Sequence, residues 1–225
     1  MELEFMEQLL RIEAEAKYFL GATDRSYEQM LMDELSKMVE EAERQFGPRD
    51  RSYELLTPRI TECGYGHPYI YPFRKIRIYL TSQAKDRYLG LYQLAHETIH
   101  VMSPTESYED TVLEEGLATY FSHQYMKRVY GLHFVAPNRK YDAVMRAVAP
   151  MLAKNEFVIK ELRAHQPVIS RIDAKLLVEV AGVEPDQAML LCTDFHSYGR
   201  TNPSWSELAA QGYEQVVNGF RAIWK

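Results

Sequence analysis

The sequence has little cysteine and no long apolar run. Its two cysteines, Cys63 and Cys192, lie far apart without a C-x-x-C spacing, which excludes a disulfide framework. No segment approaches the roughly 20 apolar residues that span a bilayer. The first 20 residues lack the basic flank and uninterrupted apolar core of a signal peptide. We therefore expect a cytoplasmic protein with free thiols and no membrane-spanning segment.

Excess basic charge is also missing. The 225 residues carry a net charge of −6, and residues 1–47 alone hold 12 acidic and 5 basic side chains, so the rest is nearly neutral. This balance provides no basic surface for nucleic acid and no basic helix for a membrane surface, so neither is expected as a partner. A hydrophobic content of 46% is that of a globular protein with a real core.

The apolar periodicity and the turn residues predict a mostly helical chain with a small sheet. Strict alternation over residues 75–80 indicates a strand, and the Gly-, Pro- and Tyr-rich residues 63–72 indicate a loop or a bent edge strand. Helical patterns cover residues 2–20, 26–46, 87–102, 107–130, 138–152, 155–165, 171–181, 185–192 and a stretch from 204 onward.

These elements predict an α+β fold, predominantly helical, in one domain over residues 1–225. Residues 1–47 would form an N-terminal helical hairpin. Residues 48–131 would hold the sheet and the helices with the candidate site, and residues 132–225 would form a helical C-terminal lobe.

One motif on the predicted helix 87–102 carries specific chemistry. His96-Glu97-Thr98-Ile99-His100 reads H-E-x-x-H. Residues four apart share a helix face, so the imidazoles of His96 and His100 can bind one Zn²⁺. Glu97 is rotated about 100° from His96 on the helix. Its carboxylate can therefore lie beside the metal and act as a general base.

A catalytic zinc site needs a third protein ligand. The next predicted helix contains Leu-Glu-Glu-Gly-Leu-Ala over residues 113–118, which offers Glu114 and Glu115. The turn at 103–106 is short, so the two helices should lie side by side. Small side chains at Ala118, Thr119 and Ser122 share a face with Glu115 and would allow a close approach.

H-E-x-x-H followed by a Glu in an E-G-x-A segment resembles the gluzincin metallopeptidases, the aminopeptidase N family in particular. The resemblance covers about residues 75–122 and implies a zincin-like minimal metallopeptidase fold. It implies zinc bound by His96, His100 and Glu115, and a peptide substrate that pairs with strand 75–80. The G-x-M-E-N segment of the aminopeptidases is absent, and Thr119 stands where thermolysin-like enzymes have an Asp.

Gluzincins also use a Tyr or His from a downstream loop to stabilise the oxyanion of the transition state. His196, Tyr198 and Arg200 in the loop 193–203 are the candidates for this role, although they also fit an ordinary polar surface loop. Asp110 could accept a hydrogen bond from a ligand histidine. Its spacing from Ser107 is equally that of a helix capping box, which we take as its role.

The sequence thus predicts a zinc-dependent metallopeptidase that acts on a peptide or protein substrate, with Glu97 as general base. The alternative is a non-catalytic, zinc-containing module that binds peptides or proteins. A helical interaction protein without metal is a third possibility. The presence of Glu97 favours the enzyme, because a structural zinc site has no use for a general base.

Overall fold

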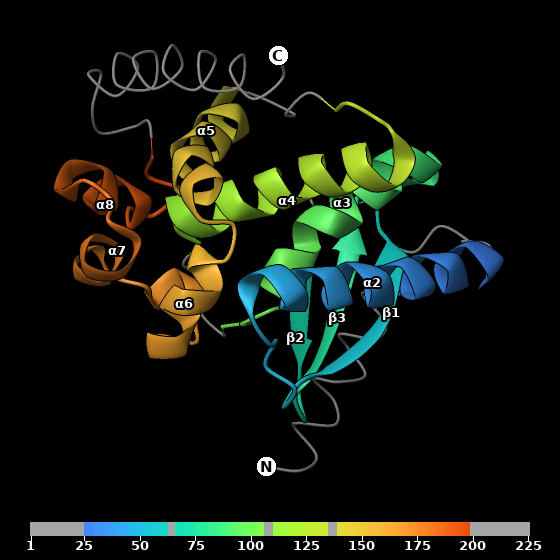
Figure 1. The fold of residues 1–225 in the computed structure, drawn as a ribbon. Coiled ribbons are helices and arrows are strands. Elements are labelled where there is room, and N and C mark those ends of the chain that lie inside the picture. Colours follow the sequence, from blue (N-terminus) through green and yellow to red (C-terminus); the bar gives the residue numbers. More distant parts are fainter. Residues whose placement is uncertain (1–24, 63–65, 106–109, 135–138, 199–225) are drawn as a thin grey trace.

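The computed structural model describes residues 25–62, 66–105, 110–134 and 139–198 (Figure 1). Its helices are α2 (Arg25–Phe46), α3 (Arg87–His100), α4 (Val112–Tyr130), α5 (Arg139–Lys154), α6 (Val158–His165), α7 (Ala174–Ala181) and α8 (Pro185–Leu191), with short 3₁₀ turns at Ser82–Lys85 and Ile169–Arg171. Its strands are β1 (Glu54–Ile60), β2 (His67–Tyr71) and β3 (Lys75–Leu80). The fold is therefore α+β and mainly helical, as predicted.

The three strands form one sheet in the order β1-β3-β2. β1 runs parallel to β3, and β2 runs antiparallel to it. The predicted strand 75–80 is confirmed as β3, and its alternate side chains Ile76, Ile78 and Leu80 are fully buried or nearly so. β1 has no counterpart among the predicted elements. β2 lies inside the region predicted to be a loop or a bent edge strand, and it is an edge strand.

In Figure 1 the sheet lies below α2, α3 and α4, while α6, α7 and α8 group together at the left. Buried side chains from α2 through α8 belong to one hydrophobic cluster. α3 contributes Leu91, Leu94 and Ile99 to it, and α4 contributes Leu113 and Leu117, all without exposed surface. α3 and α4 are thus held in place on several sides, which is what a rigid site between them requires. Within the described part of the chain, no helix combines the length and the apolar character needed to cross a membrane.

The start of α3 is predicted correctly, and the start of α4 is not. The Asp86 carboxylate accepts hydrogen bonds from the backbone N–H groups of Tyr88 and Leu89, which fixes the first turn of α3. For α4 the cap is Thr111, whose hydroxyl accepts from the N–H of Glu114. Asp110 lies before the helix, so the predicted capping box with Asp110 inside the first turn is wrong.

The other helices follow their predictions within a few residues. α2 ends where Gly47 takes a positive φ of 89°, and α4 ends at Gly131 with a φ of 67°. α5 to α8 correspond to the predicted helices 138–152, 155–165, 171–181 and 185–192. Cys192 is a free thiol. The predicted helices 2–20 and 204 onward, the hairpin that includes the first of them, Cys63 and Ser107 lie outside the described residues.

Gly116 lets α4 and α5 approach closely. A Cβ atom at this position would lie 2.5 Å from the carbonyl oxygen of Val144 and 2.7 Å from Cγ1 of Val148, both on α5. Only a residue without a side chain fits there. The Gly of the E-G-x-A segment therefore has a packing role, in addition to its place next to Glu115.

Gly116→Ala is expected to lower the free energy of unfolding by about 1–3 kcal/mol, because the added methyl group must push α5 away from α4. Urea denaturation of both proteins measures the change. At an open helical position the same replacement would stabilise the protein by about 1 kcal/mol, so a more stable variant would contradict this packing. Glu40→Ala, on the exposed surface of α2, is the control and should change stability by no more than about 0.5 kcal/mol.

Candidate metal centre

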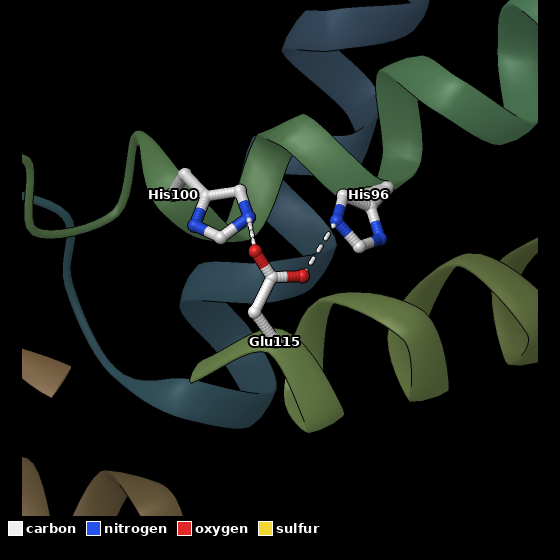
Figure 2. A group of neighbouring side chains, drawn as sticks. All are labelled: His96, His100 and Glu115. Carbon is white, nitrogen blue, oxygen red and sulfur yellow. Dashed lines mark ion pairs between the residues drawn. The ribbon is translucent and has the colours of Figure 1, made fainter. Parts of the chain in front are cut away.

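His96 and His100 project from the same side of α3, and Glu115 reaches toward both from α4 (Figure 2). Glu115 Oε2 lies 3.3 Å from His96 Nε2, and Glu115 Oε1 lies 3.7 Å from His100 Nε2. The three ligand atoms that such a site would use lie within 4.8 Å of one another. The structure therefore brings together all three residues predicted as metal ligands, in a group that could hold a metal ion.

Glu115 is well suited to receive a cation. The residue is 5% exposed, and its Oε2 atom is buried without a hydrogen-bond partner in the structure. Burial raises the pKa of Glu115, but the imidazoles of His96 and His100 more than compensate and leave the pKa below its usual value. This buried carboxylate oxygen makes no regular hydrogen bond and lies 3.3 Å from His96 Nε2, so Glu115 and the two imidazoles fit the donor set of a zinc ion.

α4 lies close to α3 because its facing residues are small. Ala118, Thr119 and Ser122 are fully buried, as expected from their position on the same face as Glu115. The hydroxyl of Thr119 donates to the backbone carbonyl of Glu115, and that of Ser122 donates to the carbonyl of Thr119. These hydroxyl groups are thus satisfied within α4, so the close approach leaves neither of them without a partner.

Glu97 lies beside this group and is almost completely buried, with 6% of its surface exposed. Burial raises the pKa of Glu97, and the two imidazoles only partly offset that rise. The backbone passes close by at Gly66, where a Cβ atom would lie 3.2 Å from Glu97 Oε1. Glu97 is thus a confined carboxyl group of raised proton affinity next to the candidate ligands, as a general base requires.

A pocket of about 420 Å³ lies against these side chains. It is lined by residues 66–72 and Ile76 of the sheet region, His96, Glu97 and His100 of α3, Pro104, Thr105 and Asp110 of the α3–α4 connection, Glu114 and Glu115 of α4, and Tyr141 of α5. A concave site with convergent carboxyl, imidazole and aromatic groups is the usual setting for binding or catalysis.

β2 and Ile76 of β3 both line this pocket, but the strand at the edge of the sheet is β2, and not β3 as predicted from the resemblance. β3 has β1 on one side and β2 on the other, so both of its edges are occupied and it cannot pair with a substrate. Among the described residues, β2 pairs with β3 alone. Pro68, which is paired with Ile78 in the register, has no N–H to donate to β3. We take Pro68–Ile78 as a pair without hydrogen bonds, in which case the backbone groups of Pro68 and Ile70 point away from β3.

The loop residues predicted for transition-state stabilisation lie nearby but outside the pocket. His196 is exposed, yet its charge acts on the carboxylate of Glu115. Tyr198 packs against the hydrophobic core. Neither is among the described residues that line the pocket, and Arg200 lies outside the described part of the chain. The loop is attached to the start of α4 by a hydrogen bond from Phe195 N–H to the Asp110 carbonyl.

Tyr141 was not among the predicted site residues. Its ring lies 5.5 Å from the ring of His96, edge to face, and it lines the pocket. Burial, together with the charges of Glu115 and Glu97, raises the pKa of Tyr141, so its phenol stays protonated at neutral pH. No local signal distinguishes this tyrosine, because it lies 26 residues beyond Glu115 and only the packing of α5 on α4 brings it to the site.

Comparisons with models of protein families, with curated proteins and with solved structures found no match for this chain.

Proposed function

We propose that this protein is a zinc-dependent metallopeptidase that hydrolyses peptide bonds. The observation that carries the proposal is the convergence of His96 and His100 with Glu115, beside a buried Glu97 and in contact with a pocket. Three ligands and a neighbouring general base are the minimum set for metal-assisted hydrolysis. The gluzincin-like motifs supply the same assignment of roles. A zinc ion in this site would supply Lewis acidity, both to the attacking water and to the peptide carbonyl.

The protein residues supply the remaining steps. Glu97 accepts a proton from the attacking water and returns it to the leaving amine, because its burial favours the protonated form in between. Tyr141 is our candidate for a hydrogen bond to the developing oxyanion, since its phenol is protonated, it lines the pocket and its ring lies 5.5 Å from that of the candidate ligand His96. His196 and Tyr198 remain alternative donors to the oxyanion. Neither lines the pocket, so each would have to move to reach the substrate.

The edge of β2 that has no partner strand in the described part of the chain provides the means to hold a peptide. An extended peptide can add to this edge as an antiparallel strand. One of its carbonyl groups would accept a hydrogen bond from the N–H of Ile70, and one of its N–H groups would donate to the carbonyl of Ile70. At Pro68 the edge offers a carbonyl acceptor alone. A peptide placed there lies along the pocket wall formed by residues 66–72, next to His96 and Glu97. The substrate would thus be recognised mainly through its backbone.

The test of this function measures metal and activity on the same protein. Purified protein loaded with zinc and freed of excess metal is expected to hold one zinc per chain and to cleave unstructured peptides such as those in reduced, denatured casein. Removal of the metal with a chelator should abolish cleavage, and added zinc should restore it. Zinc well below one per chain would overturn the metal site. One zinc per chain without cleavage of peptides would indicate the non-catalytic binding module instead.

A further inference from the structure

Two consecutive glutamates at the start of α4 face the two nitrogens of one imidazole. Glu115 Oε1 lies 3.7 Å from His100 Nε2, while Glu114 Oε1 lies 3.4 Å from His100 Nδ1 on the opposite side of the ring. The side chains of Glu114 and His100 are 6% and 9% exposed. Glu114 therefore contacts the candidate ligand His100 in a place that solvent hardly reaches.

This contact suits one of the two neutral forms of His100. A neutral imidazole has one N–H group and one lone pair, and a carboxylate can only accept a hydrogen bond. When Nε2 binds a metal ion, the one proton of the neutral ring is on Nδ1, where the carboxylate of Glu114 can accept a hydrogen bond from it. A carboxylate bonded to the far nitrogen also increases the basicity of a ligand histidine and fixes the orientation of its ring.

Asp110 is the competing partner for the same nitrogen. Its Oδ1 atom lies 3.8 Å from His100 Nδ1, and its side chain is 35% exposed. The shorter distance and the much deeper burial favour Glu114 as the group that holds the ring, because solvent weakens the interaction at Asp110. Glu114 also interacts electrostatically with the buried guanidinium of Arg163. This arginine donates to the backbone carbonyl of Met102, just beyond the end of α3.

We propose that Glu114 is a positioning residue for the metal site: it holds His100 with the proton on Nδ1 and Nε2 free to bind the metal. The inference rests on the proposed zinc site, and it assigns a role to Glu114, which precedes the proposed ligand Glu115. Asp110 then contributes little to metal binding, although it lies near the same ring.

The test compares zinc affinity in four variants by competition with a chromophoric chelator. Glu114→Leu removes the acceptor and is expected to weaken zinc binding by about 10–100-fold. Glu114→Gln keeps an acceptor oxygen without the charge and should give a smaller loss. Asp110→Asn should stay within about threefold of the native protein, while Glu115→Gln, which alters a ligand, should lose more than either Glu114 variant.

The absorption spectrum of bound Co²⁺ gives a second readout, independent of activity. It should shift in the Glu114 variants, because His100 is no longer held in one orientation. If Glu114→Leu does not fold, as judged by circular dichroism, Glu114→Gln and Asp110→Asn still decide the question. Native affinity in Glu114→Gln, or a greater loss in Asp110→Asn than in Glu114→Gln, would overturn the assignment. Failure of the native protein to bind zinc would instead overturn the metal site itself.

Discussion

Replacement of Glu97 by Gln is expected to lower kcat for peptide cleavage by about 10²–10⁴-fold while zinc content stays at one per chain. The amide has nearly the same shape as the carboxyl group, so it fits the confined space beside Gly66 without moving α3. It cannot accept the proton of the attacking water. Because the imidazoles of His96 and His100 are unchanged, the loss should appear in the chemical step and not in metal binding.

Measurement of kcat and of bound zinc on the same sample separates these two effects. Glu40→Gln, the same chemical change on the exposed surface of α2, is the matched control and should keep both values. A Glu97→Gln protein that retains its zinc and still cleaves peptides at the native rate would show that the general base is another group.

Replacement of Tyr141 by Phe is expected to lower kcat by about 10²–10³-fold, the usual effect of removing one donor to an oxyanion. The ring should keep its edge-to-face contact with His96 and its contact with Phe195, because only the hydroxyl is lost. KM should change less than kcat, since the hydroxyl acts mainly when negative charge develops on the substrate. Zinc content should remain native.

His196→Ala and Tyr198→Phe, assayed in parallel, distinguish Tyr141 from the two loop residues predicted from the sequence. We expect a small change in kcat for Tyr198→Phe, because its ring packs against the core. His196→Ala removes a positive influence on Glu115, so a modest effect is expected. A large loss of kcat in His196→Ala, together with native kcat in Tyr141→Phe, would show that His196 in the loop, and not Tyr141 on α5, stabilises the oxyanion.

The predictions that agree with the structure depend on residues close together in sequence. The H-E-x-x-H motif needs only a regular helix to place His96 and His100 on one face, and the Asp86 cap is complete within three residues. Glu115 could be assigned from the E-G-x-A segment of the resemblance and from the small residues on its helix face, although the connection between α3 and α4 covers residues 101–111 and not only the predicted turn 103–106. The capping box of α4 was misplaced because Ser107 and Thr111 both offer a hydroxyl three residues before an acidic side chain, and only the structure shows that Thr111 is the cap.

The features that the sequence did not reveal depend on contacts between distant segments. β1 pairs in parallel with β3, and its register is irregular between Leu56 and Arg59, next to Pro58. The alternation of apolar and polar residues along β1 is therefore weak. That β2 and not β3 is the edge strand at the pocket depends on the order of the strands in the sheet, which local sequence does not reveal. Tyr141 reaches the site only because Gly116 lets α5 lie directly against α4.

Pro68 has a consequence for the behaviour of this protein in concentrated solution. An open sheet edge with an unbroken row of donors and acceptors can template the addition of strands from other copies, which leads to aggregation. Pro68 interrupts the row of donors on β2, so a second β2 strand could not form a continuous ladder with it. A single peptide needs only the pair of groups on Ile70. If peptides bind at this edge as proposed, it can accept a short extended chain and still resist growth into a larger intermolecular sheet.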